Sequence, residues 1–191
     1  MECGNNAALL AKLRELCTKH GAERPRKRCR EYTIRKFSKL MLTPEELNWL
    51  NEFELNLRLE DRLEAAAMHE GGASQAVMDS VKESEDAFRV TGEVGEPLVL
   101  YGKYKADGLP GRLIWCMATT HLPPYEREFA RVSRKILQDW VKEYGLLWNA
   151  VAEFNAPAKR WLKWCGAEFG DTLEMGGEKF IRFFIRRKDN V

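Results

Sequence analysis

Residues 146–167, which read LLWNAVAEFNAPAKRWLKWCGA, carry the pattern that decides the fold. Residues 146–152 form a nearly uninterrupted apolar run, which is typical of a strand buried on both faces of a sheet. Asn155 is placed to cap a helix over residues 156–165, and Gly166 allows the chain to turn from that helix into another strand. A buried strand followed by a helix and a further strand indicates an α/β protein.

The segment before this stretch is the strongest helical pattern in the chain. Phe129, Val132 and Ile136 recur at helical spacing, which predicts an amphipathic helix over residues 125–144 that ends at Gly145. Three strand-like runs precede it, separated by turn compositions, and we expect them to form an antiparallel meander over residues 87–94, 98–104 and 113–119.

The remaining elements follow from shorter signals. Alternating residues predict a strand over 32–36, with Tyr32 and Ile34 on one face, and a final strand pair over 167–185 that turns at Gly176-Gly177. Thr43-Pro-Glu-Glu46 is a strong helix start, and we expect that helix to continue to Ala67 and to be followed by a second over 74–85. The order β-α-α-β-β-β-α-β-α-β-β predicts a mixed central sheet flanked by helices, in one domain over residues 31–191.

Residues 1–30 are predicted to form a separate N-terminal arm. An amphipathic helix over residues 5–20 is followed by a basic linker, and a helix this short is marginal unless its apolar stripe packs against a partner. The linker reads either as a solvated connection or as a contact for acidic protein or a nucleic-acid backbone. The candidate partner-binding residues of the arm are Leu9, Leu13, Leu16, Arg26, Lys27 and Arg28.

Composition restricts the classes of function. A net charge of +2 with 45% hydrophobic residues is typical of an ordinary globular protein and gives no global argument for nucleic-acid binding. No apolar run is long enough for a membrane span. The five cysteines and three histidines show no metal-ligand spacing, so we expect no metal site, and Cys116 and Cys165 are expected to be packing residues.

Residues 147–151, 155–158 and 161–167 resemble the late signature of GNAT acetyltransferases, in which a strand, an Asn, a helix and a glycine follow one another. Further upstream the chain resembles the GNAT-like family of tailed phages, which includes the internal virion protein A type of short-tailed phages. The likeness covers about residues 32–185. The residues that carry its upstream part are Arg58-Leu-Glu-Asp-Arg62, Glu64, Ser80, Ser84, Gly102, Trp115, Thr119-Thr120, Phe129 and Ser133-Arg134.

The resemblance implies where a cofactor and its chemistry would lie. A GNAT enzyme binds the pyrophosphate of acetyl-CoA with a glycine-rich loop at a helix N-terminus, and the corresponding segment here, residues 119–126, contains two prolines and no glycine. Its candidate cofactor contacts are Thr119, Thr120 and His121, with Asn155 from the later motif. The position of the family's general-acid tyrosine is occupied by Leu162.

A catalytic base would have to come from Glu153 or Glu96. The Arg58, Asp61, Arg62 and Glu64 group is interpreted either as an i, i+3/i+4 charge network on one helix or as a functional cluster of the phage family.

Three functions remain open from the sequence. We favour a catalytically degenerate GNAT-fold protein of a tailed phage that acts as a virion-associated structural or assembly component, with other virion proteins as partners and no cofactor. The alternative is an acetyl-CoA-dependent N-acetyltransferase that modifies a host or phage protein. A third possibility is a small binder of a host factor. The expected location is the virion or the host cytoplasm.

Overall fold

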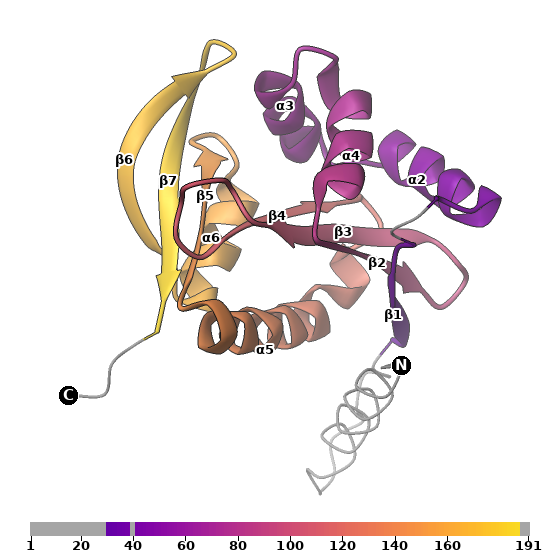
Figure 1. Ribbon diagram of the computed structural model, residues 1–191. Coiled ribbons are helices and arrows are strands. Elements are labelled where there is room, and N and C mark those ends of the chain that lie inside the picture. Colours follow the sequence, from indigo (N-terminus) through magenta and orange to yellow (C-terminus); the bar gives the residue numbers. More distant parts are fainter. Residues whose placement is uncertain (1–29, 39–40, 188–191) are drawn as a thin grey trace, which may run out of the picture.

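The computed structural model describes residues 30–38 and 41–187, and they form a mixed sheet with helices on both faces (Figure 1). The elements in chain order are β1 (Tyr32–Lys36), α2 (Pro44–Leu55), α3 (Leu59–Met68), α4 (Gly72–Glu83), β2 (Asp86–Gly92), β3 (Pro97–Tyr104), β4 (Arg112–Ala118), a 3₁₀ turn η1 (Pro123–Tyr125), α5 (Glu126–Tyr144), β5 (Leu146–Ala152), α6 (Ala156–Cys165), β6 (Glu168–Met175) and β7 (Glu178–Arg186). This architecture confirms the predicted fold class, a mixed α/β sheet flanked by helices.

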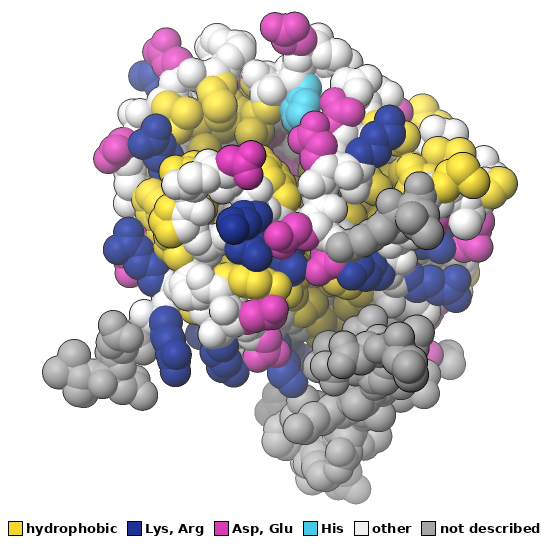
Figure 2. All heavy atoms as spheres, viewed as in Figure 1, with side chains coloured by type: hydrophobic (Ala, Val, Ile, Leu, Met, Phe, Trp, Pro, Cys, Tyr) yellow, Lys and Arg dark blue, Asp and Glu magenta, His cyan; other side chains and the backbone are white. Residues whose placement is uncertain are grey.

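The seven strands lie in the order β1-β2-β3-β4-β5-β7-β6. Neighbouring strands are antiparallel except β4 and β5, which are parallel. Helices α2, α3 and α4 cover one face of the sheet and α5 covers the other, while the β6–β7 hairpin stands at one end (Figure 1). Lys and Arg side chains gather along the edge of the molecule where α5 lies (Figure 2).

Each face of the sheet has its own apolar core. Phe53, Val77 and Leu100 belong to a cluster under α2 and α4. On the other face, α5 supplies Phe129 to a cluster on β2–β4 and Leu137 to a second one shared with α6, β5 and β7. The apolar stripe expected on residues 125–144 is therefore the side of α5 that is buried.

The first helix departs from the sequence-based expectation. Thr43 caps it through a complete capping box with Glu46, as predicted, but the helix ends at Leu55 and a separate helix begins at Leu59. The expectation of one helix to Ala67 was wrong. Residues 56–58 leave the helical path because they bond to the end of β4 and the residues after it: Asn56 O accepts from Thr120 N, Leu57 forms an antiparallel bridge with Thr119, and Arg58 N donates to Ala118 O. No proline or glycine marks this break, so tertiary hydrogen bonds decide it.

Candidate functional site

The sheet opens between its two parallel strands. β4 and β5 pair only through Arg112 with Leu147 and Leu113 with Trp148. One residue further along, the backbone pairing is replaced by a side chain, because Asn149 Nδ2 donates to the carbonyl oxygen of Ile114 over 2.8 Å. The facing edges of β4 and β5 beyond this point are therefore available to other groups.

Asp61 of α3 occupies the wide end of this opening. Its side chain is 3% exposed, and Oδ2 accepts a hydrogen bond from Ala118 N at the end of β4 over 2.8 Å. The same oxygen accepts from Arg58 Nε and Nη2, over 2.9 and 2.7 Å. The carboxylate thus satisfies a backbone donor that a neighbouring strand would otherwise satisfy, and Arg58 neutralises its charge.

Asn155 joins Asp61 from the other side of the opening. It is 1% exposed, and its Oδ1 accepts from Ala158 N, so that it caps α6 as predicted. Its Nδ2 donates to Asp61 Oδ1 over 3.0 Å and to Glu64 Oε2 over 2.7 Å. We call these three residues the Asp61–Glu64–Asn155 cluster; it links α3 to the N-terminus of α6 and, through Asp61, to the end of β4.

Glu64 is the titratable member of this cluster near neutral pH. Burial raises the pKa of its carboxyl to about 7, and the negative charge of Asp61 acts in the same direction, while the hydrogen bond from Asn155 and the positive charge of Arg58 lower it only in part. A carboxyl group that is about half protonated at neutral pH can either accept or donate a proton.

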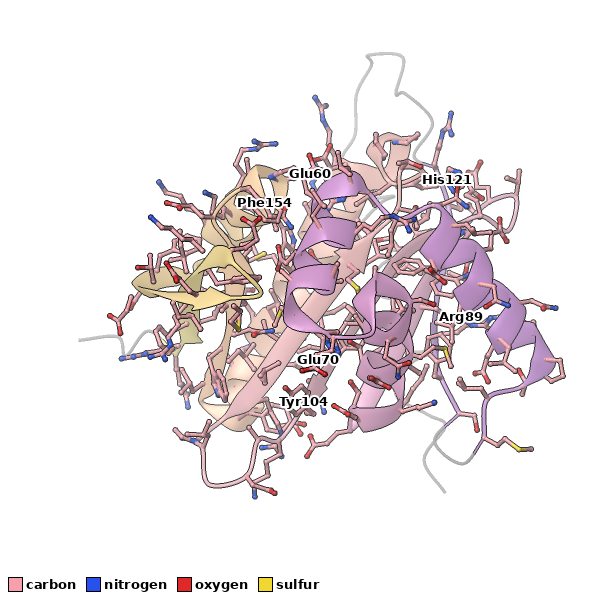
Figure 3. All side chains as sticks on the ribbon, turned by 90° about the horizontal axis from the view of Figure 1, so that it is seen from above. Glu60, Glu70, Arg89, Tyr104, His121 and Phe154 are labelled. Carbon is pink, nitrogen blue, oxygen red and sulfur yellow. The ribbon has the colours of Figure 1, made fainter. Side chains whose placement is uncertain are left out.

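A cavity of about 190 Å³ runs along the opening of the sheet. On one face α3 and α4 line it, with Glu64, Met68 and Ser80, and on the other face α5 lines it, with Ile136 and Trp140. Figure 3 looks down on α3 and α4, which lie over this part of the sheet.

A second cavity, of about 320 Å³, lies at the N-terminus of α5, where the resemblance implies a cofactor. Its walls come from α5 and α6, with Phe129 and Ala130 facing Trp161 and Trp164. We call it the α5–α6 cleft. Its charged lining residues are Glu126 in the first turn of α5 and the arginines Arg58 and Arg160, so the cleft carries charges of both signs.

The backbone donors beside this cleft are bonded within the chain. Pro123 and Pro124 have no N–H group, and the other six residues of the segment 119–126 donate to protein acceptors. These bonds run from Thr119 N to Leu98 O, Thr120 N to Asn56 O, His121 N to Thr119 Oγ1, Leu122 N to Thr119 O, Tyr125 N to Leu122 O and Glu126 N to Pro123 O. This segment therefore presents no free N–H group to a phosphate.

The predicted cofactor contacts Thr119, Thr120 and His121 differ from one another in how exposed their side chains are. Thr119 is fully buried and its Oγ1 donates to Pro97 O over 2.6 Å, whereas Thr120 is exposed. His121 is half-buried, and its Nδ1 is a buried atom with no hydrogen-bond partner among the described residues. In Figure 3 His121 lies toward α2, well away from Phe154, so it is separate from Asn155 and the cluster.

The two predicted catalytic bases line neither cavity. Glu96 directly precedes β3, and its carboxylate accepts from Tyr125 Oη over 2.7 Å. Burial alone would raise its pKa, but this hydrogen bond and backbone hydrogen bonds hold the pKa below its usual value. Glu153 is exposed, and its carbonyl oxygen accepts from Lys159 Nζ. The structure therefore does not bring these two carboxylates to the cluster. Both stay predictions as catalytic residues.

Leu162, at the position of the family's general acid, is buried in the core shared by α5, α6 and β5.

Of the charge group predicted on α3, Arg58 and Asp61 form the expected i, i+3 ion pair. Arg62 does not join it, because its guanidinium donates to the carbonyl oxygens of Glu54 and Leu55 at the end of α2.

Several predictions lie outside the described residues. These are the N-terminal helix and linker, with Leu9, Leu13, Leu16, Arg26, Lys27 and Arg28. Within residues 30–38 and 41–187, no group of three or more His, Cys, Asp or Glu side chains is placed to hold a metal ion. No helix in the same ranges has the length and apolar character of a membrane span.

Sequence reasoning missed the link between the two halves of the cluster. It interpreted Asp61 and Glu64 either as part of a charge network on one helix or as part of a functional cluster. It interpreted Asn155, about ninety positions further on, as a helix cap and a candidate cofactor contact. The one available signal was that both motifs belong to the same family resemblance. No spacing rule relates two motifs that meet only through tertiary structure.

Comparison with known proteins gives a consistent answer on the fold. Neither a protein-family model nor a curated protein matches the chain. Solved structures do. A GNAT-family acetyltransferase from Bacillus anthracis matches with a TM-score of 0.55 at 13% identity, covering 81% of this chain and 94% of the other. The ribosomal-protein-S18-alanine N-acetyltransferase from Escherichia coli matches with a TM-score of 0.55 at 14% identity, covering 84% and 99%.

The aminoglycoside acetyltransferase AAC(6')-Ib, in a complex with acetyl-CoA, matches with a TM-score of 0.58 at 16% identity, covering 82% of this chain and 94% of the other. At such identities the likeness concerns the fold alone. The chain therefore has a GNAT-like acetyltransferase fold, as the resemblance of residues 147–167 implied.

Proposed function

We propose that this chain is a GNAT-fold protein of a tailed phage that has lost acyl transfer and acts as a virion-associated structural or assembly component, either internal or associated with the tail. Other virion proteins would be its partners. The proposal joins two arguments, one for the loss of cofactor binding and one for the biological setting.

The loss of cofactor binding rests on the segment between β4 and α5. Six of its backbone N–H groups are bonded inside the chain and two of its residues are prolines. A pyrophosphate needs several N–H groups directed at it near a helix N-terminus. To supply them here, the segment would have to break the hydrogen bonds that attach it to Leu98 of β3 and Asn56 of the α2–α3 connection.

The virion setting rests on the phage-type residues of the sequence, among them Arg58, Asp61 and Glu64. The structure supports a structural use of these residues, because Arg58 neutralises Asp61 and Asp61 holds the end of β4. The arm over residues 1–30, with its apolar stripe and basic linker, is the part we assign to partner contact, and possible contact with nucleic acid is confined to that linker.

Calorimetry with acetyl-CoA and with CoA tests the first argument. We expect no measurable heat of binding to the full chain at ligand concentrations that saturate active GNAT enzymes. If acetyl-CoA binds, a charge placed in the α5–α6 cleft by Ala130→Glu must weaken the binding, while Ala66→Glu on the exposed side of α3 must not. Such a result would refute the loss of cofactor binding.

Mass spectrometry of particles purified by density gradient tests the second argument. We expect the chain to remain with the particles through gradients that remove soluble lysate proteins. Its absence from particles, together with its presence in the lysate, would contradict a virion role whatever the calorimetry shows.

An N-acetyltransferase that modifies a host or phage protein is the second candidate. One observation favours it: the Asp61–Glu64–Asn155 cluster places a carboxyl group with a pKa of about 7 beside a cavity at the opening between β4 and β5. Such a group is suited to accept a proton from an amine. Acetyl transfer to lysate proteins that is lost in Glu64→Gln and kept in Glu52→Gln, on the exposed side of α2, would establish this candidate.

A further inference from the structure

Helix α3 turns an apolar side toward solvent. Leu59 and Leu63 are 66% and 50% exposed, and Ala66 is also exposed. These residues stand at positions i, i+4 and i+7, so they lie on one side of the helix, and we call them the α3 stripe. Leu55, which is 78% exposed, ends α2 beside α3, because Arg62 donates to its carbonyl oxygen. An apolar stripe that faces water marks a contact surface.

The α3 stripe is separate from both cavities. The opposite side of α3 carries the buried residues Asp61 and Ala65, which line the first cavity. The three residues of the stripe line neither that cavity nor the α5–α6 cleft. In Figure 3, where Glu60 marks its first turn, α3 lies on the viewer's side of the sheet. The stripe is therefore a surface for another chain segment and not the wall of a small-molecule site.

Acidic residues predominate around the stripe. Residues 44–68, which contain α2 and α3, hold seven Asp or Glu and two Arg. Glu60 lies on α3 beside the stripe, and Glu52 is exposed one turn before the end of α2. Arg62, the one cation within α3, bonds to the end of α2. The same stripe of a second copy would therefore meet like charges, whereas a basic amphipathic helix would meet opposite ones.

The N-terminal arm of this chain has the complementary composition. Residues 1–30 hold eight Lys or Arg and three Glu. The helix predicted over residues 5–20 carries Leu9, Leu13 and Leu16, which have the same i, i+4 and i+7 spacing as the α3 stripe. Two apolar stripes of equal length and opposite flanking charge are suited to pack against each other.

The arm joins the described structure on the face of the sheet opposite α3. The Arg30 guanidinium lies 5.7 Å from the centre of the Tyr125 ring, and Tyr32 packs edge-on against the same ring. Tyr125 directly precedes α5, which covers the face opposite α3 (Figure 1). Residues 21–29 span about 30 Å at full extension, and they would have to pass round the edge of the sheet to reach α3 of the same chain. The stripe of another copy requires no such path.

We propose that the α3 stripe binds residues 5–20 of another copy of this chain. The contact joins two different surfaces, so it is heterologous and can continue from one copy to the next. This self-association goes beyond the proposed function, which assigns the arm to contact with other virion proteins. It needs neither a virion protein nor a cofactor.

Light scattering after size-exclusion chromatography tests the proposal on the purified full chain, under reducing conditions that keep the cysteines as thiols. We expect a mass above that of one chain, which rises with protein concentration. Leu13→Glu in the arm and Leu63→Lys in the stripe should each lower the mass to that of one chain. Leu109→Lys is the matched control, because Leu109 is 51% exposed between β3 and β4, and it should associate as wild type does.

An equimolar mixture of the two variants separates this contact from other modes of association. Leu13→Glu keeps an intact stripe and Leu63→Lys keeps an intact arm, so the mixture should regain the mass of two chains. Leu59→Lys, at the other exposed leucine of the stripe, should repeat the result of Leu63→Lys, which covers the case in which one of these substitutions disturbs the fold.

Four outcomes overturn the proposal. Wild type with the mass of one chain would mean that the arm docks on its own α3 or on nothing. Association of Leu13→Glu alone would indicate that stripe packs on stripe. A mixture that stays at the mass of one chain, or a loss of association in Leu109→Lys equal to that in Leu63→Lys, would show that the contact is not between arm and stripe. No acetyl-CoA or phage particle is present, so these outcomes are independent of the tests of the proposed function.

Discussion

The side-chain amide of Asn155 donates to Asp61 Oδ1 over 3.0 Å, although 94 positions separate the two residues. This hydrogen bond connects the N-terminus of α6 to α3 across the place where β4 and β5 part. Asp61 in turn bonds to Ala118 N at the end of β4. A pair of buried polar side chains thus joins the two halves of the sheet at the point where backbone pairing between them has ended.

Replacing Asn155 should therefore destabilise the protein in two separable ways. Asn155→Ala removes the α6 cap, worth about 1 kcal/mol, and also removes the amide that donates to Asp61 Oδ1 and Glu64 Oε2, worth about 1–3 kcal/mol more. Asn155→Ser keeps a capping oxygen but has no amide to donate. Its free energy of unfolding should therefore lie between those of wild type and Asn155→Ala. Urea unfolding at pH 7 measures both. A loss of less than about 0.5 kcal/mol in the Ala variant, which is the size of an ordinary surface effect, would contradict a role for the bond.

The raised pKa of Glu64 predicts a stability that falls as the pH rises. The folded protein holds the proton more tightly than the unfolded chain, so the stabilisation is fully present below about pH 4.5 and is lost as the pH rises through about 7. The loss is on the order of 3 kcal/mol. Glu64→Gln keeps a neutral group at all pH values, so it should be more stable than wild type at pH 8 and similar to it near pH 4.5.

Urea titrations of wild type, Glu64→Gln and Glu52→Gln across this pH range provide the test. The exposed Glu52 serves as the control for loss of one negative charge and should follow wild type. Parallel pH profiles for Glu64→Gln and wild type would show that Glu64 ionises in the folded protein as it does in the unfolded chain.

The two cysteines of the described structure should be poor nucleophiles. Burial raises the pKa of the Cys116 thiol far above its usual value, and burial raises that of Cys165 to about 12 despite the nearby charge of Arg134. Since the thiolate is the reactive form, iodoacetamide at pH 8 should leave both residues unmodified in the native protein and modify both in guanidinium chloride. Peptide mapping by mass spectrometry reads each site separately. Labelling of either at the rate of free glutathione would contradict this burial.

The sequence predicts the elements whose signals are local. The bounds of β1, β5 and α6 agree with the expected ranges, because alternating strand residues, an apolar run and the Asn155 and Gly166 caps each lie within one element. The capping box at Thr43 is equally local. These patterns act through backbone geometry and nearby side chains, so one short stretch of sequence is enough to predict each of these elements.

The break of the first helix and the assembly of the cluster have causes outside their own segments. Residues 56–58 contain no helix breaker, and they leave the helix because the end of β4 offers hydrogen-bond partners. Asp61 and Asn155 are separately typical of a helix surface and a cap. Only the topology of the sheet places them within hydrogen-bond distance, which no period or motif spacing encodes.

The tip of the β6–β7 hairpin gives the last prediction, through two neighbouring glycines. Gly176 and Gly177 both have positive φ angles, of 57° and 79°, so an alanine at either position pays a similar backbone cost of about 1 kcal/mol. They differ in surroundings. A Cβ on Gly176 would overlap the carbonyl oxygen of Ala67 on α3, whereas a Cβ on Gly177 would meet nothing within 4 Å. Gly176→Ala must therefore either push the hairpin away from α3 or strain both backbones, and we expect it to cost at least about 2 kcal/mol more than Gly177→Ala. Thermal and urea unfolding of the two variants compare them directly, and equal losses would mean that the hairpin tip does not rest on α3 in solution.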